Sequence, residues 1–358
     1  MGQKSNLMSI KNKILFGIRI FSLFTLLVTC HFVRSQPRMT FRSYTVLDGL
    51  SHNFTRQIYE DSKGFVWIST EDGLNRFDNY SFKVYRNDPE DSSSISNNII
   101  MDVEGDGLGN IWVGTWGGGI SIYNKVLDSF TRLRHIEGAA NTLTSDFIYD
   151  IFRDSQGRMW VGTTGGINMI DINTGKIINF SHEPDNPKSI SNNRVRSITE
   201  DDNKKLWLGT LGGGLNYFDP ATGICEQFVH DTKNPNSISS NEVYVVFYDS
   251  QKRLWAGTWG QGLNLKVDRK GSFKHFTHNP EDTKSIANYE LWCINETPDK
   301  RIWIGTDNGL CLFNDIDNNF HIYQHFSGDP KSLSANSIKG ISVDRHGRLW
   351  NGTNNGGF

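Results

Sequence analysis

The sequence predicts an all-β fold, a seven-bladed β-propeller, and three observations support this prediction. The phrase Trp-x-Gly-Thr, or a close variant, occurs seven times, at successive tryptophan spacings of 45, 48, 47, 48, 48 and 47 residues. The 358 residues include 35 Gly, 22 Phe, 11 Tyr and 10 Trp, and short apolar runs alternate with turn residues between the phrases. A repeat of this length and composition is typical of a propeller, in which each repeat forms one four-stranded blade. The seven copies are Trp67-Ile-Ser-Thr, Trp112-Val-Gly-Thr, Trp160-Val-Gly-Thr, Trp207-Leu-Gly-Thr, Trp255-Ala-Gly-Thr, Trp303-Ile-Gly-Thr and Trp350-Asn-Gly-Thr.

One repeat shows how a blade is built. A first strand is expected over the apolar residues 99–103, followed by a turn at 106–110, where Gly and Asp favour turn conformations. The remaining three strands are expected at residues 111–115, 120–123 and 129–133, with a run of three glycines between the first two of these. Connections this short leave no room for a helix, so the four strands form an antiparallel meander.

The repeat tryptophan is expected to be a packing residue. It lies in the middle of the second strand beside apolar neighbours, so its ring should wedge between adjacent sheets. Burying a side chain of this size is worth roughly 1.5–3 kcal/mol. We therefore assign the seven repeat tryptophans to the contacts between blades and give them no chemical role.

The two ends of the sequence are expected to meet in one blade. Residues 40–46 resemble the fourth strands of other repeats, such as 81–85, yet they precede any first strand. They should complete the last blade, whose first two strands are expected at 338–343 and 348–352, because an open sheet edge leaves backbone groups unpaired. The sequence ends at residues 356–358, where the third strand of that blade should begin. We therefore expect a seventh blade that lacks its third strand, closed by the N-terminal strand, in a chain truncated in mid-blade.

The N-terminus has a different character. Three lysines precede an apolar stretch over residues 14–33, and small residues follow near Ser35. This pattern predicts a secretory signal peptide over residues 1–35, cut near Ser35. Two alternatives stay open: a lipoprotein signal with Cys30 as the lipidated residue, and an uncleaved membrane anchor, since the stretch approaches the length of a bilayer span. The propeller itself is expected over residues 38–358.

Composition excludes several classes of function. The formal net charge is only −2, so no basic field favours nucleic acid. The four cysteines show no Cys-x-x-Cys spacing for zinc or redox chemistry, and we predict no disulfide. Five histidines recur at the end of the outermost strand, around the rim, and cannot converge on a metal. We therefore predict no catalytic residue, no metal and no cofactor. The cysteines are Cys30, Cys225, Cys293 and Cys311, and the histidines are His135, His182, His230, His278 and His325.

A first candidate site lies at the glycine-rich turns between second and third strands. The residue four places after each repeat tryptophan starts this turn, and its type varies from repeat to repeat. Trp116 and Trp259 are aromatic there, and a flat ring beside glycine is a platform on which a sugar can stack. They belong to blades two and five and should face each other across the central funnel. The alternative is that both rings pack on the turn of the next blade. The seven residues are Glu71, Trp116, Thr164, Leu211, Trp259, Asp307 and Asn354.

A second candidate set lies eleven residues before each repeat tryptophan, in the innermost strand. The position nine before the tryptophan is apolar in every repeat, which marks it as core. Polar and aromatic variety two residues earlier suggests side chains near the funnel mouth, in reach of a ligand. A plainer alternative is that these side chains cap the funnel with water and one another. The set comprises Arg56, Met101, Tyr149, Arg196, Tyr244, Trp292 and Lys339.

Residues 206–219 and 234–241 make a family resemblance specific. Leu-Trp-Leu-Gly-Thr-Leu-Gly-Gly-Gly-Leu-Asn-Tyr-Phe-Asp, followed by Asn-Pro-Asn-Ser-Ile-Ser-Ser-Asn, is similar to the two-component regulator propeller. The resemblance covers residues 38–358 and implies the periplasmic sensor region of a hybrid sensor histidine kinase, on the periplasmic side of the inner membrane. It further implies a second propeller, a β-sandwich, a membrane span and a kinase beyond residue 358, a homodimeric full-length protein, and glycan fragments as the signal.

Three functions are considered. The leading one is a ligand-sensing module that binds an oligosaccharide and regulates polysaccharide use, with no enzymatic activity in this chain. The second is a periplasmic enzyme, a lyase or a glycoside-cleaving protein. Glu71 and Asp307 are the only carboxylates at their repeat position, but they fall in blades one and six, which favours binding over concerted catalysis. The third is a protein-interaction scaffold, a common use of propeller faces.

Overall fold

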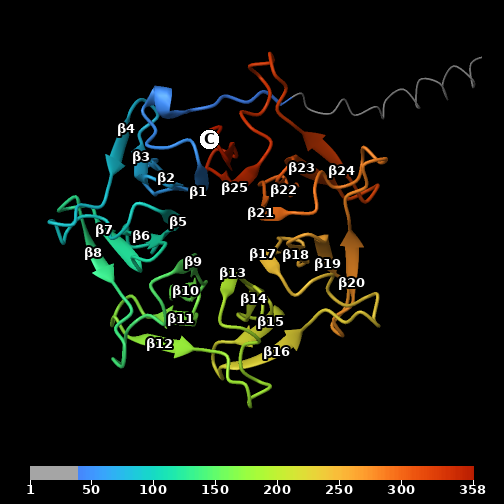
Figure 1. Ribbon diagram of the computed structural model, residues 1–358, viewed down its shortest axis with the longest axis horizontal. Helices are drawn as coiled ribbons and strands as arrows, with labels where there is room; N and C mark the ends of the chain where they lie inside the picture. The colour runs from blue at the N-terminus through green and yellow to red at the C-terminus, as the bar shows by residue number, and fades with distance from the viewer. Residues whose placement is uncertain (1–38) are drawn as a thin grey trace, which may run out of the picture. The chain divides into compact units, whose positions relative to one another are not determined.

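The computed structural model describes residues 39–358, so the predicted signal peptide over 1–35 and its two alternatives lie outside the described residues. Residues Phe41–Phe358 form one unit, a ring of small sheets whose first strands lie innermost (Figure 1). Each sheet is an antiparallel meander with its strands in chain order from the centre outward. No helix within the described residues is long and apolar enough to cross a membrane.

Six sheets have four strands, as the repeat pattern predicts. The first three blades comprise β1 (Thr55–Glu60), β2 (Val66–Thr70), β3 (Gly73–Phe77) and β4 (Phe82–Tyr85); β5 (Ile100–Gly105), β6 (Ile111–Thr115), β7 (Ile120–Asn124) and β8 (Ser129–Leu133); and β9 (Ile148–Arg153), β10 (Met159–Thr163), β11 (Gly166–Ile170) and β12 (Ile177–Phe180). The next three comprise β13 (Val195–Glu200), β14 (Leu206–Thr210), β15 (Gly214–Asp219) and β16 (Ile224–Phe228); β17 (Val243–Tyr248), β18 (Leu254–Thr258), β19 (Gly262–Lys266) and β20 (Phe273–Phe276); and β21 (Leu291–Glu296), β22 (Ile302–Thr306), β23 (Gly309–Asn314) and β24 (Asn319–Tyr323).

The predicted seventh blade is corrected by the structure. β25 (Ile338–Val343) and β26 (Leu349–Thr353) form a two-stranded sheet, so the propeller has six blades and this pair of strands. The predicted N-terminal strand over residues 40–46 is also wrong. That segment runs into the short 3-10 helix η2 (Val46–Asp48), whose capping box at Thr45 turns the chain away from an extended path. A strand needs several consecutive paired residues, and only one pair forms here.

That one pair nevertheless ties the two ends together. The Tyr44 N–H donates to the Phe358 carbonyl at 2.9 Å, and the Phe358 N–H donates to the Tyr44 carbonyl at 3.2 Å. Their rings stack with centroids 5.4 Å apart, and Phe358 packs in a buried cluster with Phe77. β25 lies between β21 and β1, which closes the ring (Figure 1).

The repeated phrase is explained by the contact between consecutive blades. Trp160 is fully buried against first-strand residues of the next blade, including Val195, and its Nε1–H donates to Asp154 at 2.8 Å. A Cβ on Gly162 would lie 2.6 Å from the Val195 carbonyl oxygen, so the next blade can approach only a glycine. Thr163 donates from Oγ1 to the Gly166 carbonyl at 3.0 Å and fixes the turn into the third strand. Six repeat tryptophans are buried as expected, whereas Trp350 of the two-stranded sheet is only half-buried.

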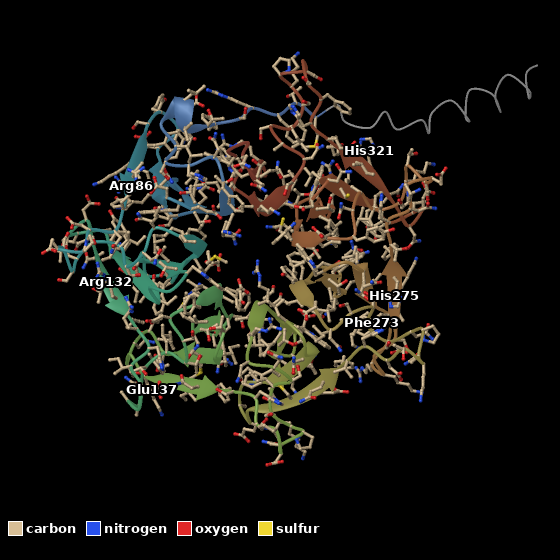
Figure 2. All side chains as sticks on the ribbon, in the orientation of Figure 1. Arg86, Arg132, Glu137, Phe273, His275 and His321 are labelled. Atoms are coloured by element: carbon tan, nitrogen blue, oxygen red, sulfur yellow. The ribbon has the colours of Figure 1, made fainter. Side chains whose placement is uncertain are left out.

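The outer strands are tied to the loops that precede them. In Figure 2 Arg132 on β8 and His275 on β20 lie at the rim of the ring. Arg132 donates from Nε to the Ser94 carbonyl at 3.1 Å, and the His275 Nε2 lies 2.8 Å from the Ser237 carbonyl. The connections between blades are therefore held against the outermost strand.

We expect Gly340→Ala to destabilise the propeller by about 1–3 kcal/mol or more, because the added Cβ would lie 1.6 Å from the Arg56 carbonyl oxygen. The unfolding midpoint in urea measures this. Gln57→Ala, at the same repeat position, removes no side-chain hydrogen bond within the described residues and is the matched control, which should stay within about 0.5 kcal/mol of the wild type. Equal midpoints for the wild type and Gly340→Ala would show that the junction between β25 and β1 is loose.

Candidate functional site

The first strands surround a central channel with a volume of about 340 Å³. All seven residues of the set eleven before the repeat tryptophan line it: Arg56, Met101, Tyr149, Arg196, Tyr244, Trp292 and Lys339. The residues two positions later are buried between blades, as the sequence predicted. The structure thus places all residues of the second candidate set on the wall of one channel. The role of this set in ligand binding stays a prediction.

One side of the channel carries a cluster of three aromatic rings, Tyr244, Trp259 and Trp292. Trp259 stacks on Tyr244 with centroids 4.9 Å apart and an interplanar angle of 26°. Trp292 meets Trp259 edge-on, at 5.1 Å and 82°. Trp259 keeps 37% of its surface exposed, so part of this residue remains open to solvent. This cluster joins a residue from the glycine turn with two from the first strands.

Trp116 lies in a different environment. Its ring meets Phe147 at 5.0 Å and Tyr149 at 5.4 Å, and its backbone forms a bridge with Phe147. Trp116 is half-buried and packs on the segment that enters the next blade. This arrangement corresponds to the alternative given in the sequence analysis, in which the ring packs on the neighbouring blade. Trp259 is therefore the more open platform of the two.

Arg196 connects the two aromatic groups. Its guanidinium lies 5.7 Å from the ring centroid of Tyr149 and 5.6 Å from that of Tyr244. Within residues 39–358 its side chain forms neither an ion pair nor a hydrogen bond, so its N–H donors face the channel without an acceptor. Contacts with two ring faces hold the guanidinium in place while its edge stays available.

The two candidate carboxylates are each paired with a cation. Lys339 bonds Asp307 at 2.7 Å and lies 3.4 Å from the ring centroid of Trp292. Partial burial acts to raise the pKa of Asp307, but hydrogen bonds from Lys339 and Ser337 outweigh it and hold that pKa at about 2. On the other side Arg56 bonds Glu71 at 3.1 Å. Both candidate carboxylates are therefore held in ion pairs.

A set of carboxyl groups in the channel wall was missed by the sequence reasoning. Asp102 accepts the Ile151 N–H and Asp150 accepts the Ile198 N–H, each at 2.6 Å, so each carboxyl group binds the backbone of the next blade. Burial raises the pKa of Asp102 well above its ordinary value, and the charge of Asp150 adds to this. Burial also raises the pKa of the adjacent Glu104 to about 7. Carboxyl residues in the first strands of two consecutive repeats were the available signal.

The histidines at the rim have a structural role. His182 and His230 each place Nδ1 2.8 Å from the backbone carbonyl eight residues later, which closes the loop to the next blade. Cys225, Cys293 and Cys311 are free thiols. Neither the rim histidines nor these three cysteines take part in the polar contacts of the channel described above.

The fold and the channel together define a β-propeller that is built from sequence repeats and has aromatic and cationic side chains around its central channel. Residues 49–72, 142–165, 189–212 and 237–260 match the family model of the two component regulator propeller. Each matched segment runs from the loop before a first strand to just past the Thr of Trp-x-Gly-Thr. Four segments of the chain therefore match two component regulator propeller repeats.

Similar proteins point to the same context. The extracellular domain of a putative hybrid two component system from Bacteroides thetaiotaomicron is 27% identical, with a TM-score of 0.76, over 89% of this chain and 41% of that one. Histidine kinase P4 of Formosa agariphila is 54% identical over 56 residues, 16% of this chain and 4% of that protein. The chain therefore spans less than half the length of either relative. Virginiamycin B lyase from Staphylococcus aureus, at 16% identity and a TM-score of 0.62 over 86% of this chain and 94% of that one, shares the fold alone.

We expect the propeller to lose stability as pH rises from about 4.5 to 7, because folded Glu104 holds its proton more tightly than the unfolded chain does. Glu104→Gln should remove up to about 3 kcal/mol of the difference in unfolding free energy between pH 5 and pH 8. Urea unfolding at both pH values measures it. Glu226→Gln, an exposed position on β16, is the control and should leave the difference unchanged; a Glu104→Gln variant that behaves the same way would contradict the assignment.

Proposed function

We propose that this chain is the ligand-sensing propeller of an exported two-component signalling protein, a hybrid histidine kinase, and that it recognises oligosaccharides on the periplasmic side of the inner membrane. Support for the sensor role comes from the matched repeats and from the similarity to an extracellular domain of such a system. The open aromatic cluster at the channel carries the proposal of a sugar ligand.

The geometry of the cluster suits a pyranose ring. The exposed part of Trp259 offers a stacking surface for the C–H face of a sugar, and Trp292 stands at right angles to it as a side wall. Arg196 supplies unpaired N–H donors for sugar hydroxyl groups on the neighbouring wall. An apolar surface with a few convergent polar groups is the usual composition of a small-ligand site.

The signal would pass to parts of the protein beyond this chain. On this proposal further modules, including a second propeller, a β-sandwich, a membrane span and the kinase, follow residue 358 in a homodimer. A ligand that binds one arrangement of propeller and downstream modules more tightly biases the kinase toward the corresponding state.

The ion pairs of the two candidate carboxylates, Glu71 and Asp307, favour binding over catalysis. A glycoside-cleaving enzyme needs one carboxyl group that donates a proton and another that acts as base or nucleophile. Glu71 is bonded to Arg56 and Asp307 to Lys339, while Asp102 and Asp150 bind backbone N–H groups between blades. These four carboxyl groups are thus engaged in ion pairs or in contacts between blades, which favours a binding role.

We expect Trp259→Ala to weaken oligosaccharide binding by about 1–3 kcal/mol and to leave the melting temperature nearly unchanged, because the ring is partly exposed. Trp116→Ala should weaken binding by a similar amount and also lower the melting temperature, since Trp116 packs on Phe147. Calorimetry against xylo-, arabino-, cello- and galacto-oligosaccharides, with thermal melts of the same variants, measures both.

Tyr80→Ala is the matched control, since Tyr80 is an aromatic residue with 94% of its surface exposed on the turn between β3 and β4. It should change neither quantity. A Trp259→Ala variant that binds every oligosaccharide as the wild type does would overturn the site, and one that melts early would show that the ring is a core residue.

A further inference from the structure

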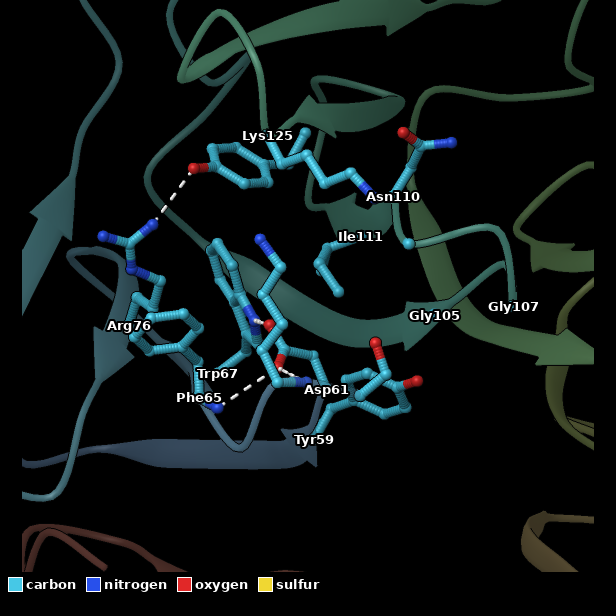
Figure 3. Close-up of a pocket in the computed structure, with 14 residues that line it drawn as sticks. Tyr59, Asp61, Phe65, Trp67, Arg76, Gly105, Gly107, Asn110, Ile111 and Lys125 are labelled. Atoms are coloured by element: carbon cyan, nitrogen blue, oxygen red, sulfur yellow. Dashed lines mark hydrogen bonds between the residues drawn. The ribbon is translucent and has the colours of Figure 1, made fainter.

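A second cavity, of about 120 Å³, lies between blades 1 and 2 (Figure 3). It is lined by the turn from β1 to β2, by β3 and by the glycine-rich turn from β5 to β6. These turns lie at the end of the blades opposite the glycine turns that carry Trp116 and Trp259. The cavity is therefore separate from the channel site.

The junction between blades 1 and 2 lacks a glutamate contact that three other junctions make. At three junctions a glutamate ends the first strand and accepts two hydrogen bonds from the turn of the preceding blade. Ser155 donates to Glu200 at 2.9 and 3.0 Å, and Ser250 donates to Glu296 at 2.9 and 2.8 Å. Arg345 donates to Glu60 at 2.8 and 2.7 Å. Blade 2 has Gly105 at this position. A Cβ there would lie 2.1 Å from the Tyr59 hydroxyl oxygen, so the glycine makes room for the Tyr59 ring, which lines the cavity.

A second departure from the repeat faces the same cavity. The residue paired with the repeat tryptophan on the third strand is apolar or aromatic in the other five blades: Ile122, Met169, Tyr217, Leu265 and Leu312. In blade 1 it is Arg76, paired with Trp67. Its guanidinium lies 4.8 Å from the ring centroid of Phe65 and donates to the Tyr123 hydroxyl at 3.1 Å (Figure 3). No carboxylate lies within ion-pair distance of Arg76 in the described part of the chain.

Two further cations come from other elements. Lys63, from the turn after β1, and Lys125, from the turn after β7, line the cavity, and neither forms an ion pair within residues 39–358. Asp61 is the one acidic lining residue, and its carboxylate already accepts the Lys63 and Phe65 N–H groups and the Trp67 Nε1–H. Three cations and one acid leave the lining with a net charge of +2.

We propose that this cavity binds an oxoanion group, a sulfate, phosphate or carboxylate. Arg76 supplies a donor fork fixed by its contacts with Phe65 and Tyr123, and the two lysines supply mobile ammonium groups, a combination suited to oxygen-rich anions. The volume is below the about 300–1,000 Å³ of pockets for whole small ligands, so the site takes one charged group. That group is either a free inorganic anion or a substituent of a sugar chain.

The test is calorimetric titration of the protein with sodium sulfate at constant ionic strength. We expect Arg76→Leu to weaken sulfate binding by about tenfold or more and to keep the wild-type melting temperature, because other blades carry Leu at this position. Lys125→Gln, at an exposed turn position, should weaken binding with no risk to folding. Lys270→Gln makes the same charge change on the exposed turn between β19 and β20 and should have no effect. Equal sulfate binding by the wild type, Arg76→Leu and Lys125→Gln would overturn the proposal.

Further variants identify the source of the anion and separate the two sites. Galactose 6-sulfate binding about tenfold more tightly than sulfate would show that the anion is carried by a sugar, whereas equal affinity, with no binding of galactose, would indicate a free anion. Lys63→Gln should weaken the binding of either ligand, because it removes one of the two ammonium groups that line the cavity. Trp259→Ala should leave sulfate binding intact, so loss of the channel site and loss of this one are distinguishable.

Discussion

The structure depends on the contact between the second strand of one blade and the first strand of the next. A blade is a narrow sheet with two apolar faces, and it is stable only when both are covered. The repeat tryptophan covers one face, and the glycine two residues later lets the next blade approach within van der Waals distance. Side chains such as Asp102 and Asp150 then bind the neighbouring backbone. The ring is the consequence of repeating this one contact.

The channel depends on a β-bulge in each first strand. The strand register shifts at the residue eleven before the repeat tryptophan, and the bulge turns this residue toward the centre although the apolar residue two positions later packs against the neighbouring blade. Six blades and the strand β25 thus place Arg196, Tyr244 and Trp292 around one volume, although they lie far apart in the sequence. The fixed positions of the blades make the channel wall rigid. The chemical character of the wall depends on residue types at positions that the fold leaves free to vary.

Departures from the repeat are informative in this protein because most positions serve packing. Where blades share a residue type, packing explains it, as with the buried isoleucines between sheets. At Arg76 the other five blades have an apolar or aromatic residue, so packing gives no reason for the change, and this residue lines a cavity. The channel and this cavity are two places where such departures lie.

The sequence by itself determined the repeat, the strand order within a blade and the buried tryptophans, because these follow from the repeat spacing and from the local alternation of side chains along a strand. The variable residue types marked the channel positions, but a β-bulge in each first strand, and not alternation, turns these residues toward the centre. It did not determine the ring closure: residues 40–46 have the pattern of a strand, but η2 and a single pair between Tyr44 and Phe358 replace it, since strand pairing depends on a partner elsewhere. The contrast between open Trp259 and packed Trp116 was equally beyond the sequence, because both occupy the same repeat position. Contacts across blades, between Trp116 and Phe147 and among Tyr244, Trp259 and Trp292, decided it, and such contacts exist only once the blades are assembled in space.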